Sequence, residues 1–225
     1  MKVTNIGTRT AFNIEDYQIL YGYLRNYTKN ISDEGEIYNR KMIRDFILVQ
    51  SNTGLRFGEC RFLKWHYVSV VKGENRYPNV HIRVPAEISK VRKDRTSVGM
   101  RGDFFTRIKT YSNHTHSDDY IFSDMKTGEP LGKKVLYNMW HLIMRESGLG
   151  ESLNDYTYYC LRHTFATYRL QYGKVDIRTL AKVMGCSVTY IEQHYDSARV
   201  ENMTDYITRG VNEKSKDAFG DVILR

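Results

Sequence analysis

The chain has 225 residues, and its 34 Lys and Arg against 26 Asp and Glu give a formal net charge of +8 at pH 7. Such an excess of cations suits a polyanion such as nucleic acid, although many ordinary basic proteins share it. The cysteines Cys60, Cys160 and Cys186 include no pair spaced for a metal knuckle or a redox motif, which indicates reduced thiols in a cytoplasm. No apolar run reaches membrane-spanning length, and the first residues lack a signal-peptide core, so we expect an intracellular protein without a membrane partner.

The first third of the chain has the periodicity of helices. Residues 1–12 carry no apolar face and are expected to be a lead-in segment. Apolar residues then recur every three to four positions over 13–27 and 37–50, a spacing that places them on one face of a helix. A shorter helix is expected over 58–64.

The period then changes to that of strands. Three short segments rich in Val, Ile and Thr, at 66–72, 80–84 and 95–100, predict a small antiparallel sheet. Helical spacing returns afterwards, in segments at 102–111, 133–147, 161–170, 177–184, 188–194 and 202–212. The predicted fold class is therefore mainly α with a small antiparallel β-sheet (α+β), in one domain over 13–212 with a tail at 213–225.

Two arginine-containing segments lie in the first half of the chain. Residues 53–59 read TGLRFGE, where glycines flank Arg56 in a tight loop that opens a helix. Backbone and guanidinium can approach a phosphate together in such a loop, although a solvated arginine in a turn is the commoner outcome. Residues 89–96 read SKVRKDRT, a basic hairpin tip that is either a phosphate contact or a solvated turn.

A third group lies near the C-terminus. Residues 159–167 read YCLRHTFAT, residues 184–187 read MGCS, and His194 and Tyr195 follow. We expect Arg162 and His163 at the start of a helix, where backbone N–H groups favour anions.

These motifs, in this order, resemble the catalytic domain of the tyrosine recombinases, the phage integrase family, over roughly residues 12–200. The resemblance implies the tyrosine recombinase catalytic-domain fold and an enzyme, a site-specific recombinase. Such an enzyme cleaves and rejoins DNA strands through a covalent 3′-phosphotyrosine intermediate, for the integration or excision of a phage or mobile element. It implies no metal and no cofactor.

The resemblance also implies a role for each matching residue. Arg56 and Arg162 match the two catalytic arginines, and Tyr195 matches the nucleophile. Lys90 matches the lysine that protonates the leaving 5′ oxygen, with Lys93 as the alternative because the register across a loop is soft. Glu59 matches the acidic residue that supports the first arginine. Two further catalytic positions depart from the family pattern: Tyr159 stands where histidine is usual, and Cys186 where histidine or tryptophan is usual.

The predicted DNA-contacting residues are Arg92, Lys93, Arg95 and His163. For His163 the competing interpretation is a packed histidine at a helix start, and His194 is expected to neighbour the nucleophile without taking part.

The chemistry needs this set of residues. A tyrosine hydroxyl has a reference pKa of about 10 and is a weak nucleophile near neutral pH. Two fixed arginines can stabilise the charge that builds on the phosphate oxygens, and a lysine can protonate the leaving group. The tyrosine then holds the DNA 3′ end as an ester that can be rejoined.

The resemblance implies double-stranded DNA as partner, at an attachment or core site. It also implies a tetramer on synapsed DNA, a monomer alone, room for a DNA-bending accessory factor, and a place in the cytoplasm of a bacterium or phage-infected host. The N-terminal core-binding domain of the family is expected to be absent, since the first helix begins near residue 13. Two alternatives stay open: a type IB topoisomerase-like enzyme, and a DNA-binding accessory protein with a degenerate active site.

Overall fold

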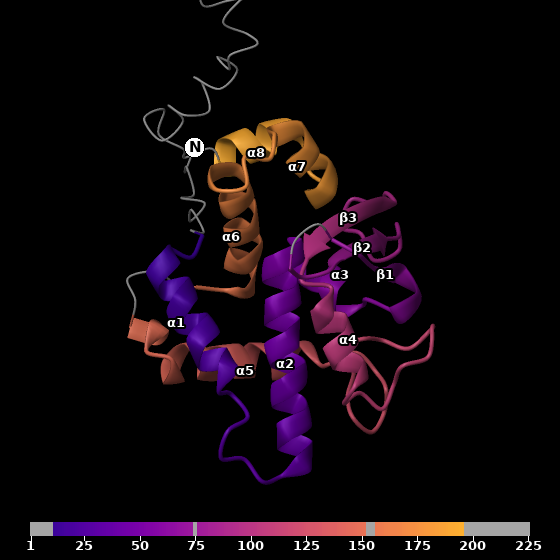
Figure 1. The fold of residues 1–225 in the computed structure, drawn as a ribbon, viewed down its shortest axis with the longest axis vertical. Coiled ribbons are helices and arrows are strands. Elements are labelled where there is room, and N and C mark those ends of the chain that lie inside the picture. The colour runs from indigo at the N-terminus through magenta and orange to yellow at the C-terminus, as the bar shows by residue number, and fades with distance from the viewer. Residues whose placement is uncertain (1–10, 74–75, 152–155, 196–225) are drawn as a thin grey trace, which may run out of the picture.

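The computed structural model of the chain describes residues 11–73, 76–151 and 156–195 (Figure 1). Its elements in chain order are α1 (Ile14–Arg25), α2 (Glu34–Thr53), α3 (Phe57–Arg61), η1 (Trp65–Tyr67), β1 (Val68–Val71), β2 (Asn79–Val84), β3 (Arg95–Met100), α4 (Asp103–Lys109), α5 (Lys133–Glu146), η2 (Leu149–Glu151), α6 (Tyr158–Gln171), α7 (Ile177–Met184) and α8 (Val188–Tyr195). The predicted fold class, mainly helical with one small antiparallel sheet, is confirmed. The predicted helix at 202–212 lies outside the described residues.

Helix α2 runs through the middle of the molecule, with α1 and α5 on one side and the sheet and α4 on the other (Figure 1). It begins earlier than expected because the side chain of Asp33 caps it, accepting a 2.7 Å hydrogen bond from the backbone N–H of Glu36. It ends at Gly54, whose φ of 64° is the left-handed conformation that suits glycine. The helix that follows is shorter than predicted, since α3 ends at Arg61.

The sheet has the order β1-β2-β3, and both pairs are antiparallel. Alternate residues of β2 face inward, so Val80, Ile82 and Val84 are buried. Gly99 of β3 lies directly against the end of α2, where a Cβ atom would stand 2.7 Å from the side chain of Thr53. The first predicted strand is shortened, because its first two residues belong to η1.

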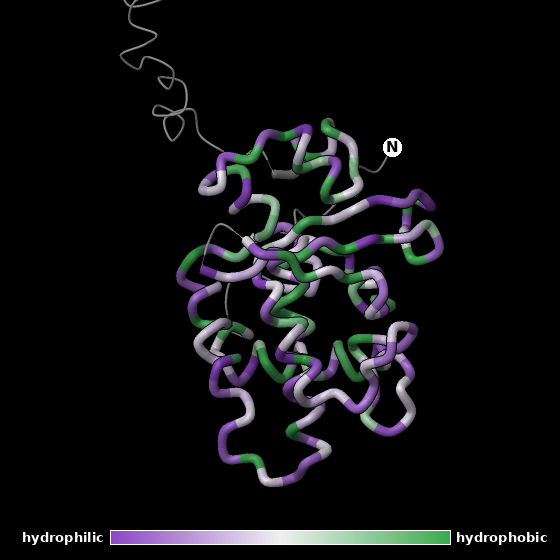
Figure 2. Tube along the Cα trace, turned by 45° about the vertical axis from the view of Figure 1, so that its right-hand side comes forward, coloured by the Kyte–Doolittle hydropathy of each residue, from purple (hydrophilic) through white to green (hydrophobic). Residues whose placement is uncertain are grey.

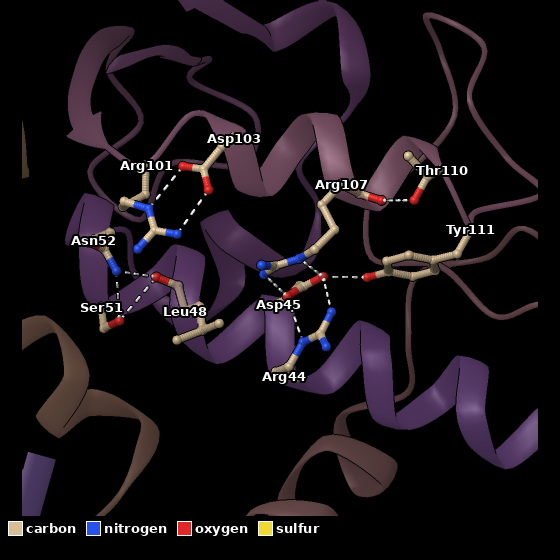
Figure 3. A network of polar contacts seen from close by, with 10 residues as sticks. All are labelled: Arg44, Asp45, Leu48, Ser51, Asn52, Arg101, Asp103, Arg107, Thr110 and Tyr111. Carbon is tan, nitrogen blue, oxygen red and sulfur yellow. Dashed lines mark hydrogen bonds and ion pairs between the residues drawn. The ribbon is translucent and has the colours of Figure 1, made fainter. Parts of the chain in front are cut away.

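A buried carboxylate ties α2 to α4 and the turn behind it. Asp45 is fully buried in α2 and accepts hydrogen bonds from the guanidinium groups of Arg44 and Arg107 and from the Tyr111 hydroxyl, the last at 2.7 Å (Figure 3). A buried charge is tolerated only when its hydrogen bonds are satisfied. This network therefore fixes α4, and with it the end of the sheet, relative to α2.

The apolar residues form two clusters. The large one, here called the main core, surrounds α2 and includes the inner faces of α1, α5, the sheet and the first turn of α6. The small one, here called the distal cluster, consists of Phe165, Ala166, Leu180, Ala181, Met184 and Ile191. Its residues come from α6, α7 and α8, and the last two of these helices lie at the upper end of the molecule (Figure 1). Hydrophobic and hydrophilic residues are both found along these helices, as in the rest of the chain (Figure 2). Helix α6 contributes to both clusters.

None of the described helices combines the length and apolar character that crossing a membrane requires.

Candidate active site

Arg56 precedes α3, as the sequence predicts, and its side chain is held on both sides. One guanidinium nitrogen donates to Glu59 Oε1 at 2.9 Å, and another donates to the backbone carbonyl of Gly185 at 2.7 Å. The backbone N–H of Arg56 also donates to Glu59 Oε2 at 2.9 Å. These hydrogen bonds fix the side chain, which is 16% exposed and therefore still reaches the surface. The predicted pairing of Glu59 with Arg56 is present.

Glu59 holds a second arginine. Arg95, the first residue of β3, donates from two guanidinium nitrogens to the two carboxylate oxygens, at 2.9 and 2.6 Å. Burial alone would raise the pKa of Glu59, but the hydrogen bonds and charges of Arg95 and then Arg56 outweigh it and hold that pKa below its ordinary value. Glu59 is 1% exposed and therefore acts as a buried anion clamped between two cations.

Arg95 thus lies inside the site. It was predicted to contact DNA from the hairpin tip, yet its side chain is only 9% exposed and also donates to the carbonyl of Val183. The strand pairing explains this direction, because Arg95 stands opposite the buried Val84 of β2. The geometry favours a positioning role for Arg95 over a contact at the tip.

Arg162 is the most deeply buried of the three arginines, at 1% exposure. Its guanidinium donates to the carbonyl of Gly54, at the end of α2, and to the carbonyl of Met184, at the end of α7, at 2.8 Å. The predicted helix start is wrong. Helix α6 begins at Tyr158, so Arg162 lies in its second turn. It is therefore beyond the first turn, whose backbone N–H groups have no partner within the helix.

The three arginines converge on the C-terminal end of α7. They donate to three consecutive backbone carbonyls: Arg95 to Val183, Arg162 to Met184 and Arg56 to Gly185. The last carbonyls of a helix have no partners within the helix and carry partial negative charge, so cations stabilise them. Residues from three distant segments are thereby gathered at one point.

Cys186 follows this end of α7 and is half-buried. Burial raises the pKa of its thiol, and the neighbouring charges of Arg162, Arg56 and Arg95 oppose that rise only in part. Cys186 therefore stands within the arginine cluster as an uncharged thiol near neutral pH.

Tyr159 lies on the side of α6 that faces α8. Its hydroxyl is 2.8 Å from the hydroxyl of Tyr190, and its ring meets the ring of His163 edge-on, with centroids 4.8 Å apart. His163 is itself buried, which agrees with the interpretation of a packed histidine and leaves little of its surface for DNA. Tyr190 is not among the predicted site residues, and no local pattern marks it.

The remaining predicted residues lie at the edges of the site. Lys90, Arg92 and Lys93 are exposed on the loop between β2 and β3, as expected of a basic tip. Tyr195 is the last residue of α8, and the side chains of Tyr195 and His194 lie outside the described part of the structure.

Within the described ranges, no group of three or more His, Cys, Asp or Glu residues is arranged to hold a metal ion.

The fold is shared with solved recombinases. It is similar to the XerH site-specific recombinase in a post-cleavage complex with its palindromic difH substrate (TM-score 0.65, 20% identity, 91% of this chain and 55% of that chain). It is also similar to the XerA recombinase (0.62, 20%, 93% and 66%) and to a lambda integrase dimer bound to a COC′ core site (0.62, 17%, 87% and 62%). At these identities the likeness establishes the fold alone, and the chain spans little more than half of XerH.

The sequence places the chain within that class. It matches the phage integrase family over residues 20–202, and the chain belongs to that family, as the motif resemblance predicts. No curated protein sequence matches it.

Proposed function

We propose that the chain is the catalytic part of a site-specific DNA recombinase that cleaves and rejoins strands through a covalent 3′-phosphotyrosine intermediate. One observation carries this proposal. Arg56 and Arg162, which are far apart in sequence, both bond to the end of α7, and the helix that follows ends at Tyr195. Attack on a phosphodiester requires a nucleophile, here Tyr195, and fixed cations that stabilise the charge on the phosphate oxygens.

In this proposal the arginines bind the non-bridging oxygens of the scissile phosphate. Each guanidinium is planar and permanently charged, so it can stabilise the growing charge without a metal. The clamp of Glu59 between Arg56 and Arg95 supports the role of Arg56, because it fixes the guanidinium before DNA arrives. Preorganised donors cost little reorganisation in the transition state.

The leaving 5′ oxygen needs a proton, and we assign this task to Lys90, with Lys93 as the alternative. Both lysines are exposed on the β2–β3 loop, where they can follow the DNA as it binds. A lysine acts as a general acid when it lies within hydrogen-bonding reach of the leaving atom. In this proposal Tyr159, where the family usually has histidine, and Cys186, where it usually has histidine or tryptophan, support the scissile phosphate or the nucleophile.

Double-stranded DNA is the proposed partner. The XerH structure to which this fold is similar is named as bound to its difH substrate, and the lambda integrase structure as bound to a core site, which supports this choice. Assembly as a tetramer on synapsed DNA, and any bending factor, belong to the same proposal. Because contacts would be mainly to phosphates, affinity should fall steeply as salt concentration rises.

The test is a set of nicked duplexes that tile the DNA flanking the gene, since a nick beside the cleavage site traps the covalent adduct. The wild type should form an adduct, and Tyr195→Phe should bind the same DNA without forming one. Absence of an adduct on every duplex would leave a DNA-binding accessory protein. Relaxation of plain plasmid without site preference would identify a topoisomerase-like activity instead.

A further inference from the structure

The position of α8 decides where the proposed nucleophile stands, and α8 is too short to be stable without tertiary contacts. It has eight residues, and isolated helices of that length are not stable in water. The side chain of Ser187 caps its first turn, accepting a 3.1 Å hydrogen bond from the backbone N–H of Tyr190. Its place in the molecule must therefore come from contacts with α6 and α7.

Val188, Tyr190 and Ile191 of α8 pack in or against the distal cluster. Ile191 is fully buried in the distal cluster, and this apolar contact holds α8 against the cluster without fixing its orientation, because hydrophobic burial is not directional. Tyr190 supplies the directional one, because its hydroxyl lies 2.8 Å from that of Tyr159 on α6. The Tyr159 ring is in turn held edge-on by the buried ring of His163.

The Tyr190 hydroxyl is suited to a structural hydrogen bond. Burial, followed by the hydrogen bond to Tyr159, raises the pKa of Tyr190 to about 12, so the group is protonated at neutral pH. Among the smaller influences on that pKa, the charge of Arg162 opposes the rise. The pair therefore joins α8 to α6, the helix that also carries Arg162.

We propose that Tyr190 is a positioning residue, whose hydrogen bond to Tyr159 docks α8 on α6 and sets where Tyr195 stands for attack. The inference rests on the proposed recombinase function and deepens it. Tyr195 follows Tyr190 by five residues, or about 7.5 Å along a helix axis, so a shift at one residue is passed to the other. Attack on phosphorus tolerates little misplacement of the attacking atom.

The experiment compares Tyr190→Phe, Tyr159→Phe and the double variant in single-turnover cleavage of the nicked duplex at saturating protein. Each single variant should cleave about tenfold more slowly, with unchanged DNA affinity. The losses in the double variant should be less than additive, because each single variant already removes the hydrogen bond that joins the two hydroxyls. Tyr172→Phe, whose residue is 61% exposed on the far end of α6, is the matched control and should cleave as the wild type does.

Amide hydrogen exchange in the absence of DNA gives a second readout that does not depend on catalysis. In Tyr190→Phe, residues 188–195 should exchange faster while α2 is unchanged. Wild-type cleavage by both phenylalanine variants, or additive losses in the double variant, would overturn the proposal. It would also be overturned if Tyr190→Phe abolished the adduct and Tyr195→Phe retained it, because Tyr190 would then be the attacking residue.

Failure of the proposed function is distinguishable from failure of this inference. If the wild type forms no adduct at all, the recombinase proposal fails. Hydrogen exchange then decides the docking of α8 alone, and unchanged exchange in Tyr190→Phe would overturn it.

Discussion

The main core and the distal cluster differ in size and in what they carry. The main core encloses α2 with side chains from α1, α3, α5, the sheet and the start of α6, whereas the distal cluster rests on six buried residues. Fewer buried apolar contacts mean a lower free energy of local opening. Arg56, Glu59 and Arg95 lie on elements that surround the main core, while α8, which ends at Tyr195, packs on the distal cluster. We therefore expect Arg56, Glu59 and Arg95 to be held more rigidly than α8, whose last residue is the proposed nucleophile Tyr195.

Polar contacts join the two regions. Helix α6 changes sides between Leu161, which is in the main core, and Phe165, which is in the distal cluster, and Arg162 lies at the change. The arginine contacts to the last carbonyls of α7 cross the same boundary. Since hydrogen bonds to charged groups are stronger than neutral ones, three such contacts can align two bodies that share little apolar surface.

The largest expected effect comes from removing Arg56, which precedes α3 beside the main core and bonds to the Gly185 carbonyl at the end of α7. Arg56→Ala should lower single-turnover cleavage by roughly 10²–10³-fold, as the loss of one transition-state donor does, with little loss of DNA affinity. Arg61→Ala is the matched control, because Arg61 lies at the other end of α3 and bonds to the carbonyl of Leu131. Equal losses in cleavage and affinity for Arg56→Ala would indicate a simple phosphate contact.

Two fully buried isoleucines compare the regions directly. Ile43→Ala, in α2, should lower the global free energy of unfolding by about 3 kcal/mol, measured by urea denaturation. Ile191→Ala, in α8, should lower it much less, because the distal cluster can open without the rest of the fold. It should instead speed hydrogen exchange over 177–195 and slow cleavage. Equal global losses would mean that the two clusters unfold as one unit.

The carboxylate between Arg56 and Arg95 gives a pH-dependent test. The pKa of Glu59 in the folded chain lies below its ordinary value of 4.5, so its ionised form stabilises the fold. That contribution is fully present above the unfolded pKa and is lost as pH falls through the folded pKa. Glu59→Gln should therefore be less stable than the wild type by about 2 kcal/mol at pH 7, with the difference vanishing in acid.

Glu36→Gln is the control for that series. Glu36 pairs with Arg40 on the surface of α2 and is 47% exposed, so its replacement should change the free energy of unfolding by well under about 1 kcal/mol. A difference between wild type and Glu59→Gln that persists unchanged at low pH would contradict the assignment of a buried, ionised Glu59.

The smallest effect concerns the turn between α7 and α8. Gly185 has φ of 64°, and a Cβ atom there would stand 2.6 Å from the Arg95 side chain, so Gly185→Ala should lower stability by about 1 kcal/mol and also slow cleavage. Gly58→Ala, at a helical position with nothing within 4 Å of the added atom, should leave stability unchanged or raise it slightly. Thermal unfolding and the adduct assay measure both. Identical behaviour of the two variants would show that the turn does not couple the regions.

The elements were predictable to different degrees. The bounds of β3 and α7 agree with the residues predicted, because β-branched residues in one and a cap glycine in the other are local signals. The start of α6 was placed too late, since the helix begins with Tyr158 and Tyr159, before the apolar period at 161–170. Element ends depend on capping contacts, which periodicity does not report.

The site was predicted in part. The motifs name Arg56, Glu59 and Arg162, and the structure brings these residues together. They do not tell which basic residues of the 89–96 segment point outward: Lys90, Arg92 and Lys93 do, and Arg95 does not. Four neighbouring cations look alike in sequence, and only pairing with β2 turns the last one toward Glu59.

By itself the sequence determined the helical and strand periods, the family and the set of residues that could act on a phosphate, because each of these is written in local spacing. Only the tertiary structure decided that three arginines meet the last turn of α7, that Arg95 clamps Glu59, and that Tyr190 meets Tyr159. These contacts join residues from distant segments. Their existence depends on how α6, α7 and β3 pack, and a side chain chooses its hydrogen-bond partner only after that packing has fixed which groups are within reach.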